Sequence, residues 1–262
     1  MYNVHYHSKK RRNNDTFLLK GWIPLITKIT DCAIFADIPE NELSNIMPMF
    51  KERHFKKNHI LMFENDQDEE IYIIRSGMVK VCRINEGREI VLGISMPGDI
   101  IGETEALSSD QHRISSIEAL EGVSTWLISK NDFLDIVEKY PSVLRKAYMI
   151  LVERTRVLNR LVRYLTFYDV RTKVANLLMD LLYNFGKPCD NGYKIDLKIN
   201  QTLLANMLGV TRESISKTIG DFQNEGLIDL NGKYVYLLDM SKLELLCNET
   251  EEIPSLRKWN SL

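Results

Sequence analysis

The sequence lacks the features that mark membrane, secreted and metal-cluster proteins. No apolar run in its 262 residues approaches the roughly 20 residues that a membrane-spanning helix needs. The N-terminus has no basic-then-apolar signal peptide, so we expect a cytoplasmic protein with no membrane partner. Its four cysteines, Cys32, Cys82, Cys189 and Cys247, lie tens of residues apart without a C-x₂-C spacing. This spacing argues against a zinc site or a local iron–sulfur ligand run and favours isolated reduced thiols.

Histidine and net positive charge are also scarce. His54, His59 and His112 are isolated, and no strand carries the His-x-His and carboxylate set of a metal-binding roll. No nucleophile stands beside a base, so we expect neither an enzyme nor a metal site. The net charge of −2 does not suggest a nucleic-acid-binding protein. Whole-chain charge is a weak guide, however, when one small face does the binding.

The most informative segment is Asn200–Tyr236, which predicts two short helices joined by a tight turn and followed by a β-hairpin. Gly209 supplies the conformational freedom that a sharp turn needs. Thr211 is a good N-cap for the second helix, because its hydroxyl can accept a backbone N–H. The apolar residues of this second helix repeat at i, i+4 and i+7 and are expected to face inward: Ile215, Ile219 and Phe222.

The other side of the second helix is polar near its N-terminal end, where it carries Arg212, Glu213, Ser216 and Lys217. An Arg can bond the guanine edge twice and a Glu can accept from cytosine, as in a recognition helix. Asn231-Gly232, flanked by apolar runs, predicts a type I′ hairpin that makes a wing, with Lys233 beside it. We therefore expect binding to double-stranded operator DNA. The alternative is an ordinary pair of surface helices.

The pattern along the chain predicts an α+β fold in five parts. They are a disordered or helical N-terminal arm (1–30), an effector domain built as a β-roll, or jelly roll (31–139), a dimerisation helix with a hinge (140–168), a winged helix-turn-helix domain (169–246) and a C-terminal tail (247–262). Within these parts we expect a helix from Glu40 to Phe50, a loop over Gly186–Gly192 and a strand over Tyr193–Ile199.

The segment from Pro141 to about Thr166 predicts one long helix. Its apolar positions alternate steps of four and three residues, with one Thr among them: Leu144, Tyr148, Leu151, Thr155, Leu158, Val162 and Leu165. This is a heptad seam, so we expect a homodimer through residues 141–166. The charged residues around the seam suit solvated flanks: Arg145, Lys146, Glu153, Arg154, Arg156, Arg160 and Arg163. The alternative is a single amphipathic helix packed on its own domain.

Three segments together resemble the CRP/FNR family of bacterial transcription regulators, over about residues 30 to 245. They are Pro97–Glu103 in the roll, Asp169-Val170 at the hinge and Gly209–Lys217 in the recognition helix. The resemblance implies a cyclic-nucleotide-binding-like roll and a homodimeric regulator that reads a palindromic operator with TGA-containing half-sites. RNA polymerase is the implied partner if the protein activates transcription.

The resemblance also assigns roles to residues of the recognition region. Arg212 and Glu213 match the pair that reads TGTGA in the cyclic-AMP receptor branch. Glu213, Ser216 and Lys217 stand where the FNR branch has Glu, Ser and Arg, although a Lys lacks the fork geometry of an Arg. Asn200 and Gln201 look like contacts to the DNA backbone that set the register of the protein on the duplex.

The effector site is the least defined part of the resemblance. Gly102-Glu103 and Arg113 stand where the cyclic-nucleotide-binding relatives hold the cyclic phosphate and the ribose. Ile114 replaces a Ser, however, and Leu158 and Asn159 replace the paired hydroxyl residues that contact adenine. The effector is therefore a cyclic nucleotide or another small molecule, or Glu103 and Arg113 form an ion pair in a site no longer used.

Two further expectations concern function. The rival to the DNA-binding regulator is a cyclic-nucleotide-sensing module whose main role is to bind cyclic AMP or a related nucleotide. An oxygen-sensing iron–sulfur cluster of the FNR type needs closely spaced N-terminal cysteines, and only Cys32 lies in that region. We expect no such cluster, which leaves a lone redox thiol at Cys32 or Cys82 as the remaining redox alternative.

Overall fold

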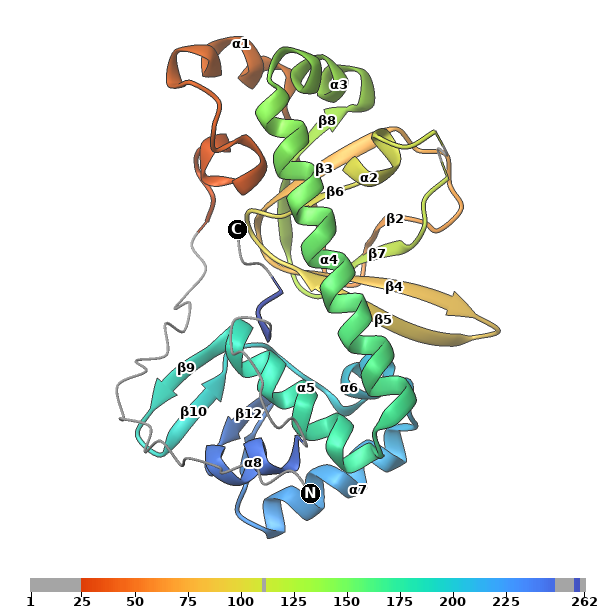
Figure 1. Ribbon diagram of the computed structural model, residues 1–262, viewed down its shortest axis with the longest axis vertical. Helices are drawn as coiled ribbons and strands as arrows, with labels where there is room; N and C mark the ends of the chain where they lie inside the picture. The colour runs from red at the N-terminus through yellow and green to blue at the C-terminus, as the bar shows by residue number, and fades with distance from the viewer. Residues whose placement is uncertain (1–24, 110–111, 248–256, 260–262) are drawn as a thin grey trace, which may run out of the picture.

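The computed structural model describes residues 25–109, 112–247 and 257–259. Figure 1 shows a β-roll and a C-terminal module of helices with a small sheet, and a long helix, α4 (Pro141–Phe167), runs from one to the other. This is the α+β architecture that the sequence predicts. Most of the expected N-terminal arm and most of the expected C-terminal tail lie outside the described residues.

The roll contains the strands β1 (Lys51–Phe55), β2 (Ile60–Met62), β3 (Glu70–Ser76), β4 (Val79–Asn85), β5 (Arg88–Ser95), β6 (Ile100–Ile101), β7 (Ser116–Ala119) and β8 (Val123–Ser129). They form two antiparallel sheets, in the orders β1-β8-β3-β6 and β2-β7-β4-β5. Because side chains alternate along a strand, β3 is buried on both faces. Tyr72 and Ile74 pack with the core between the sheets, and Ile71 and Ile73 pack with the helices outside.

Short helical turns precede the roll instead of the continuous helix expected from Glu40 to Phe50. They are η1 (Ile29–Asp31), η2 (Ala33–Phe35), η3 (Glu40–Glu42), α1 (Leu43–Ile46) and η4 (Met47–Met49). Residues 40–49 are helical as expected, but as three contiguous short stretches instead of one helix. Pro48, which has no N–H, cannot continue the α-helical hydrogen bonds of α1. The apolar residues still reach the core, where Phe35 packs edge-on against Phe50 at a centroid distance of 5.7 Å.

Two more helices complete the roll and lead into α4: α2 (Glu103–Ala106) and α3 (Lys130–Lys139). The helix α4 begins with Pro141 at its first turn, where a missing N–H costs nothing. It ends one residue beyond the predicted end, at Phe167. Tyr168 is then extended, and the Asp169 carboxylate caps the next helix, α5 (Val170–Phe185), by accepting from the Thr172 N–H at 2.8 Å. The hinge predicted near Phe167–Asp169 therefore coincides with the break between two helices.

The C-terminal module contains α5, β9 (Gly186–Cys189), β10 (Gly192–Ile195), α6 (Gln201–Leu208), α7 (Arg212–Asn224), β11 (Ile228–Asn231), β12 (Tyr234–Leu237) and α8 (Met240–Leu246). Its strands form one antiparallel sheet in the order β11-β12-β10-β9. Two expectations were wrong here. The segment expected as a loop contains the edge strand β9, which tolerates Pro188, and the strand expected to reach Ile199 ends at Ile195.

The roll and the C-terminal module are in direct contact. Val91, Ile94 and Met96, on and just after β5, share one buried core with the residues of α5, α6 and α7. The Asn206 amide of α6 donates to the Glu89 carboxylate of β5. Strand β5 is therefore in direct contact with α6, the first helix of the helix-turn-helix, so a displacement of β5 would displace α6.

Candidate functional sites

The helix-turn-helix consists of α6, a tight turn and α7. Gly209 has the left-handed conformation, with φ of 59°, that glycine adopts without strain. Both helices begin with a side-chain cap: Asn200 Oδ1 accepts from the Leu203 N–H at 2.7 Å, and Thr211 Oγ1 accepts from the Ser214 N–H at 3.2 Å. The cap predicted at Thr211 is therefore present. Asn200 serves its own helix as well, a role that the sequence reading did not assign.

The recognition helix α7 has the two faces that its sequence predicts. Ile215, Ile219 and Phe222 are buried. The polar residues near its N-terminal end are all exposed: Arg212, Glu213, Ser216 and Lys217. Thr218 completes the buried face, since its hydroxyl donates to the Ser214 carbonyl instead of facing solvent. The surface that remains open is a short polar edge at the start of an α-helix, the element that a major groove admits.

The wing differs from the predicted turn by one residue. Asn231 pairs with Tyr234, so the two-residue loop is Gly232-Lys233 and not Asn231-Gly232. Gly232 has a positive φ of 62° and Lys233 does not, whereas a type I′ turn needs positive φ at both central residues. The shift places Lys233 at the tip of the hairpin, fully accessible to a partner.

Two lysines that the sequence reading missed lie beside the wing tip. Lys194, Lys198 and Lys233 line one shallow hollow together with Tyr234. The Lys194 ammonium lies 3.7 Å from the centroid of the Tyr234 ring and is paired with Asp196. The pairing of β10 with β12 brings these lysines together, so only strand register could have predicted the cluster. With Lys194 paired to Asp196, the cluster contributes Lys198 and Lys233 as exposed basic side chains just before α6 and at the wing tip.

A cavity of about 200 Å³ lies between the roll and α4. Its walls are mainly apolar and include Leu92, Ile94, Ile101, Ile114, Ile117 and Leu158. The hydroxyl groups of Thr104, Ser115 and Thr155, which the sequence reading did not select, also lie in its wall. One aromatic side chain comes from far along the chain: Trp259, which belongs to the C-terminal tail.

The structure separates the predicted effector residues into three groups. Gly102, Ile114 and Leu158 line the cavity, whereas Asn159 is exposed outside it. Glu103 and Arg113 are buried behind the wall and do not line it. The six residues therefore do not form one continuous ligand-binding surface in the single chain.

Arg113 is engaged by the protein itself. Its guanidinium donates to the carbonyl oxygens of Glu70, at 2.5 Å, and Gly102, at 3.4 Å, and lies 3.7 Å from the Glu105 carboxylate. Gly102 has φ of 91°, and a Cβ built there would approach the Arg113 Nη1 to 2.7 Å. The Arg113 side chain thus packs against the Gly102 backbone, and its hydrogen bonds stabilise the roll.

The expectation of an ion pair between Glu103 and Arg113 is wrong, because Glu103 pairs with another arginine. Glu103 Oε1 accepts from Arg154 of α4 at 2.6 Å, and the same guanidinium donates to the Ile100 carbonyl at 2.5 Å. Arg154 was expected on a solvated flank of the seam, as was Arg160, which instead donates to the Tyr164 hydroxyl at 2.7 Å. Arg154 points inward because Ile100 and Glu103, on β6 and α2, lie within its reach. Arg160 points inward toward Tyr164 on its own helix and Asp180 of α5.

The cysteines do not form a redox site in the described part of the chain. Burial raises the pKa of the Cys32 thiol to about 12 and that of the Cys82 thiol to about 12, so both stay protonated near neutral pH. This rules against the reactive thiol considered for Cys32 or Cys82. Over the same described residues, no group of three His, Cys, Asp or Glu side chains is arranged to hold a metal ion. None of the described helices combines the length and apolar character needed to span a bilayer.

Comparisons with known proteins agree with this geometry. Residues 52–140 match the family model of the cyclic nucleotide-binding domain, and residues 172–246 match that of the Crp-like helix-turn-helix domain. A CRP-like cAMP-activated global transcriptional regulator of Mycobacterium tuberculosis is 27% identical over 211 residues, covering 80% of this chain and 94% of that protein. The regulatory protein HlyX of Actinobacillus pleuropneumoniae is 27% identical over 203 residues, covering 77% of this chain and 83% of HlyX.

A solved structure extends the comparison to three dimensions. A mutant of CooA from Carboxydothermus hydrogenoformans superposes with a TM-score of 0.71 at 26% identity, covering 82% of this chain and 95% of that one. Both modules and the helix between them are therefore shared. The chain belongs to the CRP/FNR family, a family of DNA-binding transcription regulators and not of enzymes.

Proposed function

We propose that this regulator acts as a homodimer that reads a palindromic operator with TGA-containing half-sites. The observation that carries the proposal is the apolar stripe left exposed on α4. The heptad positions Leu144, Tyr148, Leu151, Leu158 and Val162 are all exposed in the single chain, Tyr148 at 66% and Val162 at 59%. On the opposite side of the helix, Val143, Ala147 and Tyr164 are buried against the protein.

An amphipathic helix packed only on its own domain buries its apolar positions, whereas here the regular a/d stripe faces solvent. A second copy of the same helix covers such a stripe best, because the knobs of one helix fit the holes of the other. Contiguous exposed apolar side chains of this kind mark interaction surfaces. Thr155 fits this seam, since its hydroxyl is satisfied by the Leu151 carbonyl at 2.9 Å.

Two-fold symmetry then presents two recognition helices to one face of DNA, at half-sites about 34 Å apart. In each half-site Arg212 and Glu213 supply a guanine-reading fork and an acceptor for cytosine. Ser216 and Lys217 lie one turn further along the same exposed edge. Lys198 and Lys233 at the wing, with Gln201 and Thr211 at the helix starts, are suited to phosphate contacts that fix register.

The fold family implies a cyclic nucleotide in the roll, but the residues present do not fit one. A cyclic phosphate needs a cation and amides turned toward it, and both terminal nitrogens of Arg113 already donate to the Glu70 and Gly102 carbonyl oxygens. Arg113 Nε and Glu103 Oε2 are buried without a protein partner, but neither residue lines the cavity. The adenine side offers Leu158, which has no hydrogen-bonding group. We therefore do not assign cyclic AMP as the effector, although the M. tuberculosis relative is named as cAMP-activated.

Selection of bound sequences from randomised duplex DNA by the purified protein tests the proposal. The expected product is an imperfect palindrome with TGA in each half. Glu213→Ala should lose about 1–3 kcal/mol of discrimination at its base pair. Lys233→Ala should weaken all sequences alike and flatten the salt dependence of binding. Gln223→Ala, an exposed change near the far end of α7, is the matched control. Equal affinity for selected and random DNA would contradict the proposal.

A further inference from the structure

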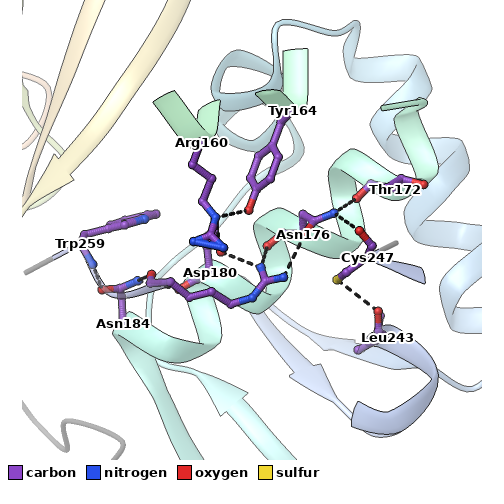
Figure 2. A network of polar contacts seen from close by, with 10 residues as sticks. Arg160, Tyr164, Thr172, Asn176, Asp180, Asn184, Leu243, Cys247 and Trp259 are labelled. Atoms are coloured by element: carbon purple, nitrogen blue, oxygen red, sulfur yellow. Dashed lines mark hydrogen bonds and ion pairs between the residues drawn. The ribbon is translucent and has the colours of Figure 1, made fainter. Parts of the chain in front are cut away.

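The C-terminal tail is anchored in the DNA-binding module by a buried arginine. The Arg257 side chain is 3% exposed and donates to Asp180 Oδ1 at 2.7 Å, to the Asn176 carbonyl at 3.0 Å and to Asn176 Oδ1 at 3.0 Å. All of these acceptors belong to α5. Figure 2 shows the network that gathers along this helix. Residues 257–259 therefore have a defined place in the fold.

This anchor fixes the position of Trp259. Its backbone N–H donates to Asn184 Oδ1 at 2.8 Å (Figure 2). Its ring packs edge-on against Phe185 at a centroid distance of 5.5 Å. The same side chain lines the cavity between the roll and α4. Trp259 thus links the end of α5 to the cavity between the roll and α4.

The charges around the cavity are unfavourable for an anion. The acidic residues Asp99 and Glu105 belong to its lining, and the Glu105 carboxylate lies 3.7 Å from the buried Arg113 guanidinium. Arg154 is the one guanidinium in its wall within the described chain, and Glu103 already neutralises it through a 2.6 Å hydrogen bond. An anionic ligand entering here would leave water and find its only cation already paired, which is costly in a largely apolar site.

The geometry points to an uncharged, largely apolar small molecule as the ligand of this cavity, with Trp259 as part of its wall. The binding of such a ligand does not depend on the proposed function. Only its role as the effector of a DNA-binding regulator rests on that proposal. Aliphatic side chains on β5, β6 and β7, outside the α4 seam, bury its apolar surface, and the indole ring provides an aromatic contact. The Thr104 and Thr155 hydroxyls donate within the protein, to Glu103 and to the Leu151 carbonyl, so their oxygens are left to accept from a ligand donor. Ser115 adds a third hydroxyl to the wall, and the set can orient a ligand polar group without requiring charge. Because Trp259 is held by α5, occupation of the cavity acts directly on the DNA-binding module.

A matched pair of fluorescent probes tests this proposal: N-phenyl-1-naphthylamine, which is uncharged, and 8-anilino-1-naphthalenesulfonate, which adds one sulfonate to the same skeleton. The uncharged probe should bind one site per chain at least about tenfold more tightly than the sulfonate, with energy transfer from Trp259. Trp259→Phe should keep the binding and lower that transfer, with the remainder coming from the other two tryptophans of the chain. Trp259→Ala should weaken the binding about tenfold, because an aromatic wall is removed.

A charge introduced into the cavity provides the decisive control. Ile114→Arg should weaken binding of the uncharged probe and strengthen binding of the sulfonate about tenfold, because it supplies the free cation that the site lacks. Ile84→Arg, at an isoleucine of similar exposure that does not line the cavity, should change neither. Equal binding of the two probes to the parent protein, or no response to Ile114→Arg and Trp259→Ala, would overturn the proposal. The titrations contain no DNA, so a failure of operator recognition leaves them unaffected.

Discussion

Arg257 and Asp180 form a buried ion pair across 77 residues of sequence, with Nη1 2.7 Å from Oδ1. Asp180 also accepts from the Tyr164 hydroxyl at 3.0 Å and lies 3.8 Å from the Arg160 guanidinium. Burial raises the pKa of Asp180 even against these two arginines. The end of the chain, α5 and the last turns of α4 are therefore joined by one polar cluster that depends on charge balance.

Removing Arg257 should destabilise the C-terminal module. Arg257→Ala leaves the Asp180 carboxylate with Arg160 alone, so we expect a loss near the lower end of the range for a broken buried pair, about 3 kcal/mol. Chemical denaturation of the purified variant measures this. Lys258→Ala, at the neighbouring residue, is the control and should lie within about 0.5 kcal/mol of the parent. A loss that is equally large for Lys258→Ala would show that the tail acts by some means other than this pair.

A second contact links the roll to the helix-turn-helix, where Asn206 donates to Glu89. Burial alone would raise the pKa of Glu89, but hydrogen bonds from Lys80 and Asn206 hold it below its usual value. Asn206→Asp puts a second carboxylate against the first and should cost about 1–3 kcal/mol at this contact. Amide hydrogen exchange should then quicken in β5 and α6.

The control for this contact is Asn191→Asp, which makes the same chemical change in the exposed turn between β9 and β10. It should leave the exchange of β5 and α6 amides unchanged. Exchange that is identical in the parent and in Asn206→Asp would mean that the hydrogen bond does not couple the two modules.

The sequence was sufficient where the determinants of structure are local. The bounds of α4 follow from a Pro at its first turn and a sustained apolar repeat, and the two faces of α7 follow from a 3.6-residue period after the Thr211 cap. These features depend on residues a few positions apart, so a linear pattern contains them. The α+β architecture follows from the same kind of signal.

The sequence was insufficient where long-range contacts decide. The partner of Glu103 is Arg154, 51 residues away, and no spacing rule distinguishes Arg154 from its solvated neighbours on α4. Trp259 reaches a cavity built from strands more than a hundred residues earlier in the chain. Strand β9 forms because β10 pairs with it, although Gly186 and Pro188 favour a loop locally.

The exposed seam of α4 makes a specific prediction about assembly. Val162→Glu places two carboxylates against each other in a symmetric pair, which should weaken dimerisation by about 3 kcal/mol or more. Because Val162 is exposed in the single chain, the fold of each protomer should be retained. Sedimentation equilibrium measures the monomer–dimer equilibrium, with Ile84→Glu, at an exposed isoleucine on β4, as the control. A monomeric parent protein, or a Val162→Glu variant as dimeric as the parent, would show that the apolar stripe of α4 is not the dimer interface.

The cap at the hinge predicts a pH dependence of stability. The Thr172 backbone N–H, which donates to the Asp169 carboxylate, holds the pKa of Asp169 below its usual value. A carboxyl group with a lower pKa in the folded than in the unfolded state stabilises the fold above its unfolded value, and this contribution is lost as pH falls through the folded value. Asp169→Ala should therefore cost about 1 kcal/mol at pH 7, and this cost should shrink in acid.

The neutral cap Asp169→Asn separates charge from hydrogen bonding at this position. Asn is as good an N-cap as Asp, so this variant should stay within a few tenths of a kcal/mol of the parent at pH 7. Its free energy of unfolding should fall less steeply than that of the parent as the pH is lowered below 5, because it has no carboxylate to protonate. Urea denaturation at several pH values measures all three proteins. Parallel pH profiles for the parent and Asp169→Asn would show that ionisation of Asp169 does not stabilise the hinge.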